Sequence, residues 1–153
     1  MKYLIRPIKE SDIWILHRWI NDPEIIRFTN TYRPISEMEQ KEWFANTEYF
    51  SNNYVFGIEM VDDKQLIGTC GLYDFDKISR KAELRLKICE KNKREKGAGS
   101  SSLKQLIDFG FNDLNLNKIW LRVQTDNIPA IKLYEKFCFV TDGTIRQDMY
   151  ING

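Results

Sequence analysis

Histidine is almost missing from this chain, and that scarcity limits the chemistry open to it. His17 is the only histidine among 153 residues. A zinc site needs a cluster of cysteine, histidine and carboxylate ligands, and a Ser-His-Asp triad needs a histidine beside a suitable serine. A lone histidine on an amphipathic helix is more often a surface or boundary residue. We therefore expect no metal site, and hydrolase chemistry is disfavoured.

Long apolar runs and an excess of one charge are missing as well. No stretch approaches the roughly 18 apolar residues that cross a bilayer. The chain starts with MKYLIR, whose charges interrupt a short apolar run, so no signal peptide is expected there. The formal net charge of +1 argues against a nucleic-acid-binding surface. We expect neither a membrane nor a nucleic acid as partner.

Cysteine is scarce and irregularly placed. Cys70, Cys89 and Cys138 are odd in number and never spaced as C-x-x-C, which is typical of reduced thiols in a cytoplasmic protein. They are expected to be buried fillers rather than nucleophiles. A chain of 153 residues with 42% apolar residues can bury a core as one domain, without disulfide or metal support.

The first third predicts one short strand and two helices. A strand is expected over residues 3–6, ended by Pro7. Ser11 is the predicted N-cap of a helix whose apolar stripe recurs with helical spacing up to residue 20. Ser36 and Glu39 form a capping box that predicts the second helix. Residues 24–34, between the helices, are expected to be irregular.

The rest of the chain predicts a mixed sheet. Alternating apolar residues indicate strands over 54–60, 66–72 and 82–88, followed by a loop and a helix over about 103–114. A strand over 119–123, a helix capped by Asn127 with Pro129 in its first turn, and an extended run over 139–151 complete the order. The order β-α-α-β-β-β-α-β-α-β predicts an α/β (mixed α+β) fold. Its first half is antiparallel, and its second half holds a parallel, right-handed crossover.

The last two residues are Asn152-Gly153, a strong two-residue hairpin signal with no returning strand after it. Either the natural protein continues, or the last strand has an open edge. Because open edges invite aggregation, we favour the first alternative.

A basic, glycine-containing loop follows the strand over 82–88. It carries four cationic side chains (Lys91, Lys93, Arg94 and Lys96), then Gly97-Ala98-Gly99 and three serines that open a helix. Glycines allow close backbone approach, and the free N–H groups of a helix's first turn attract anions. A solvated basic loop with a glycine turn explains the motif equally well. The loop's position at the carboxyl end of a strand in a crossover unit favours a phosphate cradle.

Two motifs resemble those of the GNAT superfamily of N-acetyltransferases. These are Arg94-x-x-Gly97-x-Gly99 and the downstream run NIPAIxLYxKxxF, which begins at Asn127. The resemblance extends from residues 5–7 to the C-terminus. The first helix, with Trp19 and the NDPE run at its end, and the pair Ala82-Glu83 make it most similar to the branch that acetylates ribosomal proteins, polyamines and amino sugars. The family's fold matches the element order, except that its seventh strand is absent and Cys138 stands where glycine is usual.

The resemblance implies a seat for acetyl-CoA as co-substrate. The pantetheine arm would pair with the strand at Leu86, Lys87 and Ile88. Backbone N–H groups of Arg94, Glu95, Lys96, Gly97, Ala98, Gly99 and Ser100 would hold the pyrophosphate, and Asn127 would contact the cofactor near the split between two strands.

The resemblance also implies two catalytic side chains. Tyr134 matches the tyrosine that protonates the leaving thiolate, a general-acid role, although a core tyrosine would fit the same stripe. Glu83 is a candidate base, directly or through water. An ion pair with Arg85 or Lys81, or simple exposure, explains this carboxylate nearly as well.

The acceptor is the least constrained part of the prediction. Phe28, Tyr32 and the stretch 24–34 would line its pocket by analogy, or belong to the core. An amino group of a small molecule, such as a nucleotide-linked amino sugar, is slightly preferred over a ribosomal-protein N-terminus. A non-catalytic acyl-CoA-binding module on the same fold is the alternative from another class. A homodimer is the protein partner considered.

Overall fold

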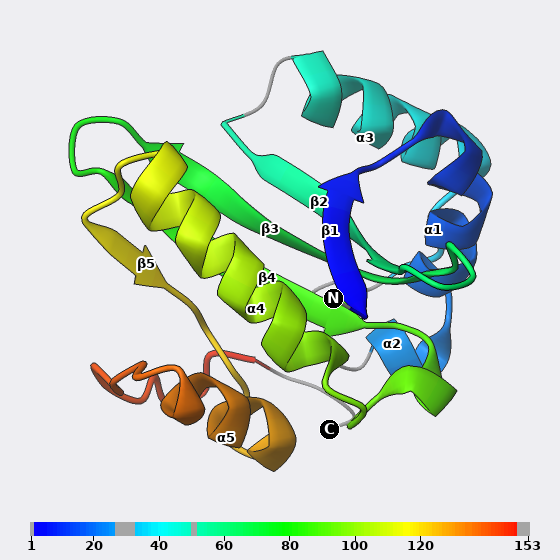
Figure 1. Ribbon diagram of the computed structural model, residues 1–153. Coiled ribbons are helices and arrows are strands. Elements are labelled where there is room, and N and C mark those ends of the chain that lie inside the picture. Colours follow the sequence, from blue (N-terminus) through cyan, green and yellow to red (C-terminus); the bar gives the residue numbers. More distant parts are fainter. Residues whose placement is uncertain (1, 27–32, 50–51, 150–153) are drawn as a thin grey trace.

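The computed structural model describes residues 2–26, 33–49 and 52–149 (Figure 1). The strands are β1 (Tyr3–Pro7), β2 (Tyr54–Met60), β3 (Leu66–Asp76), β4 (Lys81–Ile88) and β5 (Lys118–Trp120). The α-helices are α1 (Ile13–Ile20), α2 (Pro23–Ile26), α3 (Glu37–Tyr49), α4 (Ala98–Asp108) and α5 (Ile128–Lys136). Short helical turns are η1 (Glu10–Asp12), η2 (Lys91–Lys93) and η3 (Phe109–Asp113), the last of π type. No described helix is both long and apolar enough to cross a membrane.

The five strands form one sheet in the order β1-β2-β3-β4-β5 (Figure 1). The first four are antiparallel neighbours, and β4 and β5 are parallel. The mixed sheet with a parallel crossover through α4 is therefore confirmed. The alternation that predicted β2, β3 and β4 is a local signal, because successive side chains of a strand point to opposite faces.

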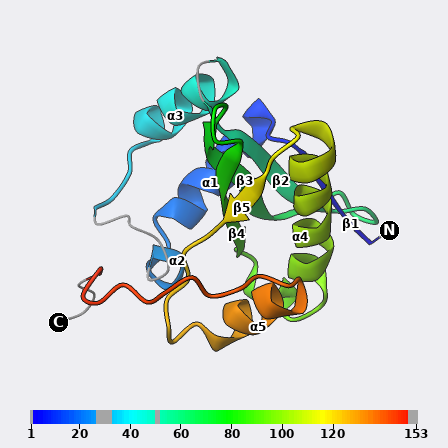
Figure 2. The same cartoon turned by 90° about the vertical axis from the view of Figure 1, so that its left-hand side faces the viewer.

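Helices cover both faces of the sheet. Figure 2 shows α4 on one side and α1, α2 and α3 on the other. The main core lies under α4, where Leu103 and Leu106 are fully buried with Ile58, Leu72 and Leu84 from the strands. A second cluster joins α1 and α2 to the sheet through Leu16, Trp19, Ile25, Leu66 and Cys89.

The start of the first helix differs from the prediction. Ser11 was expected to be the N-cap, but it lies inside η1, and Asp12 directly precedes α1. The Asp12 carboxylate accepts a hydrogen bond from the Lys9 backbone N–H (2.8 Å) and pairs with Arg6 (2.7 Å). These bonds form a helical turn before α1, so Asp12 rather than Ser11 orders this end. The short helix α2 was also not predicted.

The second capping box is confirmed. Ser36 and Glu39 exchange hydrogen bonds at the start of α3, with the Glu39 N–H donating to Ser36 Oγ (3.2 Å) and the Ser36 N–H donating to the Glu39 carboxylate (3.0 Å). The pairs with Ser36 and Arg33 lower the pKa of Glu39 to about 2. The carboxylate therefore stays charged at neutral pH, as this cap requires.

The predicted final strand is the largest discrepancy. Residues 139–149 form no ladder within the described chain, while residue 151 and the Asn-Gly pair lie outside it. The preceding strand was predicted over 119–123, but β5 pairs with β4 only up to Trp120. Because the chain turns away from β4 after Trp120, β5 is short and offers no long edge for another strand to join. The segment is held by side chains instead, as in the Lys118–Asp142 ion pair (2.9 Å).

Candidate active site

The sheet opens between β4 and β5. The parallel ladder ends where Glu83 stands opposite Trp120, whereas on its other edge β4 stays paired with β3 as far as Ile88. Residues 84–88 therefore have one edge with no partner strand in the described chain (Figure 1). Such an edge offers backbone N–H and C=O groups to an extended ligand. Leu86, Lys87 and Ile88, the predicted pantetheine residues, lie on it.

The loop after β4 presents its backbone at the start of α4. Gly97 is the N-cap with φ +87°, and Glu95 also has a positive φ, +59°. No side chain caps the helix, and its first backbone bond joins the Ser101 N–H to the Gly97 carbonyl (3.0 Å). Within the described residues, the N–H groups of Ala98, Gly99 and Ser100 therefore lack partners. Free donors at a helix N-terminus are a suitable seat for a phosphate.

Two side chains fix this loop to the sheet. Arg94 Nε donates to the Ile88 carbonyl (3.0 Å), and the Tyr3 hydroxyl donates to the Lys96 carbonyl (3.1 Å). The Arg94 guanidinium thus closes the turn between β4 and the loop. This contact explains an arginine at this position without a direct bond from its side chain to phosphate.

The two glycines serve different purposes. A Cβ on Gly97 would meet nothing within 4 Å, so this position needs glycine for its positive φ alone. A Cβ on Gly99 would come within 3.2 Å of a Leu133 methyl on α5 and 4.0 Å of Leu86 on β4. Gly99 therefore allows the start of α4 to approach both β4, on one side of the split, and α5. A backbone cradle of this kind fits a CoA pyrophosphate.

Tyr134 lies on α5, beneath the split (Figure 2). Its ring packs edge to face on Phe139, with centroids 5.7 Å apart, and it contacts the main core. Burial raises the pKa of the Tyr134 hydroxyl to about 12. The hydroxyl has no hydrogen-bond partner in the described chain and is not completely enclosed. A protonated, unpartnered donor on this helix suits the predicted acid role.

The end of α5 explains why glycine is usual after this helix. The Cys138 N–H donates to the Glu135 carbonyl (2.9 Å) and the Phe139 N–H to the Tyr134 carbonyl (3.1 Å), which is a Schellman motif. Cys138 is the left-handed residue of the motif, with φ +62°. The departure from glycine at Cys138 therefore concerns backbone conformation, not side-chain size. Cys138 is exposed, so the expectation that it is a buried filler was wrong, whereas for Cys70 and Cys89 it is confirmed.

Glu83 is held in an ion pair. Only 8% of the residue is exposed, and its carboxylate accepts two hydrogen bonds from Arg85, one of them from Nε at 2.9 Å. Arg85 in turn stacks over the Tyr73 ring at 4.5 Å. The ion-pair alternative is therefore confirmed. It is compatible with a base that acts through water, and that role stays a prediction.

The remaining predicted groups divide between structural and surface positions. Asn127 caps α5 as expected, with its Oδ1 accepting a bond from the Ala130 N–H (3.4 Å). Lys91 points toward α2, where it pairs with Glu24 (2.7 Å), both side chains being exposed. In the parts of the chain that the structure describes, no three metal-binding side chains gather.

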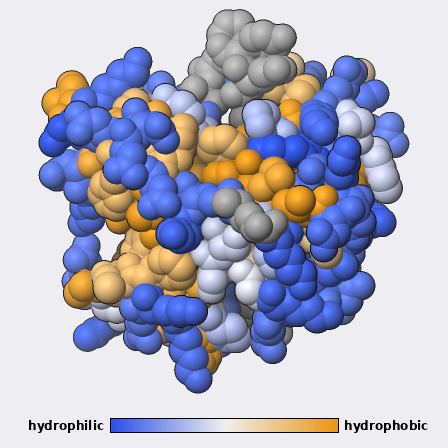
Figure 3. All heavy atoms as spheres, viewed as in Figure 1, coloured by the Kyte–Doolittle hydropathy of each residue, from blue (hydrophilic) through white to orange (hydrophobic). Residues whose placement is uncertain are grey.

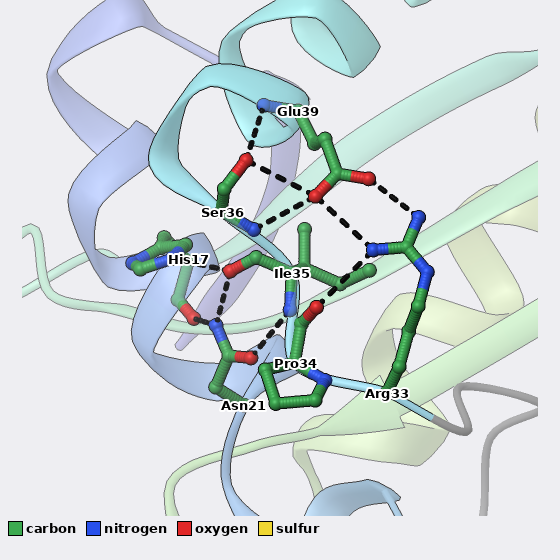
Figure 4. A network of polar contacts seen from close by, with 7 residues as sticks. All are labelled: His17, Asn21, Arg33, Pro34, Ile35, Ser36 and Glu39. Atoms are coloured by element: carbon green, nitrogen blue, oxygen red, sulfur yellow. Dashed lines mark hydrogen bonds and ion pairs between the residues drawn. The ribbon is translucent and has the colours of Figure 1, made fainter.

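The predicted capping box of Ser36 and Glu39 belongs to a wider polar network (Figure 4), whose bonds from α1 to Ile35 the sequence did not reveal. The Asn21 amide exchanges two hydrogen bonds with the backbone of Ile35: it accepts from the N–H (2.8 Å) and donates to the carbonyl (3.0 Å). His17 Nε2 lies 2.7 Å from the same carbonyl, which confirms a boundary role for the lone histidine. The network fixes the chain on the C-terminal side of the predicted acceptor stretch. Phe28 and Tyr32 lie outside the described residues.

The surface around the split is partly apolar. Figure 3 shows hydrophobic residues reaching the surface around β5 and α5, on the face drawn in Figure 1. Ile128, at the start of α5, is 50% exposed.

Comparison with known proteins identifies the family to which this chain belongs. The profile described as "Acetyltransferase (GNAT) domain" matches residues 2–140. The spermidine N(1)-acetyltransferase of Vibrio cholerae is 28% identical, over 97% of this chain and 85% of that protein. An N-acetyltransferase of Bacillus subtilis, YoaA, is 30% identical, over 99% of this chain and 87% of its own. The crystal structure of the Vibrio cholerae enzyme with CoA and spermine superposes with a TM-score of 0.93 at 28% identity, covering 99% of this chain and 89% of that one. The chain therefore belongs to the GNAT family, and it is an acetyl-CoA-dependent N-acetyltransferase.

Proposed function

We propose that the acceptor is a primary amine of a small polyamine. The observation that carries this proposal is the likeness, over nearly the whole chain, to spermidine acetyltransferases from Vibrio cholerae and Escherichia coli. The buried Glu83 carboxylate adds a chemical reason. A polyamine nitrogen is protonated at neutral pH, as a lysine amine is, and must lose a proton before it can attack.

The cofactor seat follows from the backbone. The free edge of β4 at Leu86, Lys87 and Ile88 is the proposed partner of the pantetheine arm. The loop from Arg94 to Ser100 is proposed to hold the pyrophosphate through its N–H groups other than that of Arg94, which donates to the Lys91 carbonyl (3.2 Å). Asn127 is proposed to lie near the split. Because the donors are neutral backbone groups, the exposed Lys96 of the loop is left to attract the remaining phosphate charge.

Each catalytic group has one proton to move. Glu83, through a water molecule, is proposed to accept the proton of the attacking amine. The amine nitrogen then bonds to the thioester carbon, and N–H donors on β4 stabilise the oxyanion. When the carbon–sulfur bond breaks, the Tyr134 hydroxyl donates its proton to the departing sulfur, the nitrogen loses its second proton to water, and Tyr134 recovers a proton from water.

The high pKa of Tyr134 is consistent with this acid role. A tyrosine with a pKa of about 12 is protonated over the whole physiological range. A free thiol has a pKa of about 8.5 in water, which would make transfer from tyrosine uphill. Burial raises the pKa of a thiol as well, as it does for Cys89, whose pKa rises to about 11 in the separate cluster that joins α1 and α2 to the sheet. A thiolate that leaves CoA in a site shielded from water is more basic in the same way, so transfer from Tyr134 is closer to balanced.

A second acceptor class has one specific observation behind it. A putative ribosomal N-acetyltransferase of Bacillus subtilis, YdaF, is 26% identical over 90% of this chain and 72% of its own. The amino-sugar acceptor expected from the sequence gains no such support. The non-catalytic alternative is not favoured, because the chain belongs to a family of enzymes and has a partly buried, protonated tyrosine on α5.

The test is a thiol-release assay with three acceptors: spermidine, a nucleotide-linked amino sugar, and a peptide with a free N-terminus. We expect the highest kcat/KM with spermidine, confirmed by mass spectrometry of the acetylated product. Tyr134→Phe is the matched control for enzymatic turnover. A higher kcat/KM with the peptide or the sugar would reassign the acceptor.

The oligomeric state and the cellular location of the protein are two further proposals. One structure of the Vibrio cholerae enzyme is described as dodecameric. We propose that this chain also self-associates, with a homodimer as the smallest unit, which light scattering coupled to size exclusion would test. A cytoplasmic location, expected from the cysteine content, stays a prediction.

A further inference from the structure

Glu90 connects the loop after β4 to α1. Its Oε1 accepts a hydrogen bond from the Trp19 indole N–H (3.1 Å) and pairs with Arg18 Nη2 (2.9 Å). Trp19 is only 4% exposed, so its N–H is removed from water and depends on this acceptor. The Arg18 side chain is 57% exposed, and its pairing with Glu90 contributes much less.

The backbone of Glu90 is fixed at the same point. The N–H groups of Cys89 and Glu90 both donate to the Ile67 carbonyl on β3, at 2.9 and 3.1 Å. The Glu90 carbonyl accepts a bond from the Lys93 N–H (3.0 Å), which starts the turn η2. Backbone bonds thus hold Glu90 to the sheet, while its side chain holds it to α1. Glu90 therefore sets the direction in which the loop leaves β4.

We infer that Glu90 is a positioning residue for acetyl-CoA, acting through the buried Trp19–Glu90 hydrogen bond. This inference rests on the proposed seat of the pyrophosphate at residues 94–100. The cradle consists of backbone N–H groups, which bind an anion only if they converge on it. Besides the exposed ion pairs of Arg18 with Glu90 and of Lys91 with Glu24, three side-chain hydrogen bonds hold the segment from 90 to 96 in place. They run from Trp19 to Glu90, from Arg94 to Ile88 and from Tyr3 to Lys96. Glu90 is the first of these anchors along the chain and the only one that reaches α1.

Four variants separate the indole bond from the surface ion pair. Glu90→Ala removes both, and Trp19→Phe removes the indole N–H together with part of the buried ring but leaves the Arg18 pair intact. Glu90→Gln keeps a carbonyl oxygen for the indole, and Arg18→Ala removes only the exposed partner. We expect Glu90→Ala and Trp19→Phe to weaken CoA binding about tenfold, as for one lost hydrogen bond to a charged group. Glu90→Gln and Arg18→Ala should stay within about twofold of the wild type.

Calorimetry with CoA gives Kd, and steady-state kinetics distinguish positioning from simple destabilisation. A misplaced loop raises the KM for acetyl-CoA and leaves kcat and the acceptor KM nearly unchanged. A partly unfolded enzyme instead loses kcat at constant KM. If Glu90→Ala does not fold, Trp19→Phe carries the test.

The outcomes are separable from those of the proposed function. Wild-type protein that binds no CoA would overturn the proposed seat and this inference together. Wild-type protein that binds CoA, with Glu90→Ala and Trp19→Phe binding equally well, would overturn this inference alone. Glu90→Gln as weak as Glu90→Ala would also overturn it, because the indole bond would then not be the cause.

Discussion

Replacing Cys138 by glycine should stabilise this protein. Cys138 follows α5 in the left-handed conformation, at φ +62°, where a Cβ crowds the backbone. The residue is exposed, so its thiol has few contacts to lose. The two backbone bonds of the Schellman motif, to Glu135 and Tyr134, do not need a side chain at this position.

The expected gain is a difference between two known terms. The left-handed conformation costs a residue with a Cβ about 1–2 kcal/mol. Glycine also makes the unfolded chain more flexible, which lowers the free energy of unfolding by about 0.4–1 kcal/mol and offsets part of this gain. The net gain is roughly 0.5–1 kcal/mol. For a chain of this length, 1 kcal/mol corresponds to about 2–4 °C in Tm.

Urea unfolding followed by circular dichroism measures this free energy directly. The midpoint should rise while the slope m stays unchanged, because the same surface is exposed on unfolding. Cys138→Ala is the control: it removes the thiol, keeps the Cβ and should match the wild type. The reasoning fails if the glycine variant gains nothing, or if the alanine variant gains as much.

Three further changes test the site. Tyr134→Phe should lower kcat with little change in CoA affinity, and an unaffected rate would remove Tyr134 from catalysis. Because the pKa of Tyr134 is about 12, the kcat–pH profile of the wild type should show no alkaline decline due to this residue below about pH 10. Gly99→Val should weaken CoA binding, since its Cβ would lie 3.2 Å from a leucine methyl on α5. Gly97→Val should also weaken it, because the backbone there has a φ of +87°, which valine rarely adopts. Calorimetry gives the CoA affinity of variants that keep a native circular dichroism spectrum, and normal affinity would contradict the cradle. Asn21→Ala should lose about 1–3 kcal/mol in urea unfolding, because two bonds to the Ile35 backbone disappear; a loss under about 0.5 kcal/mol would show that water replaces them.

Features that depend on residues close together in the sequence were the ones predicted correctly most often. The capping box of Ser36 and Glu39 and the cap at Asn127 each span three residues and formed as predicted. The strands β2, β3 and β4 followed from alternation for the same reason. Ser11 failed as a cap because Asp12, one residue on, has stronger partners in Arg6 and the Lys9 backbone. A propensity for capping cannot rank two adjacent candidates when a distant arginine decides between them.

Contacts between distant segments could not be predicted from one sequence. The bond from Trp19 to Glu90 joins residues 71 positions apart, and Trp19 alone suggested only an apolar stripe. The end of β5 at Trp120 is similar. Its apolar alternation continues beyond that residue, but pairing depends on where β4 and the crossover place the chain.

The two halves of the proposed active site therefore differ in how far sequence can define them. The cofactor half consists of backbone: a free edge on β4 and the first turn of α4, made accessible by Gly97 and Gly99. Backbone sites need glycines at fixed offsets, and such offsets are visible in a sequence. The acceptor half is proposed to depend on side chains, among them Glu83 on β4. Their convergence depends on the folded chain, so the acceptor has to be identified by turnover.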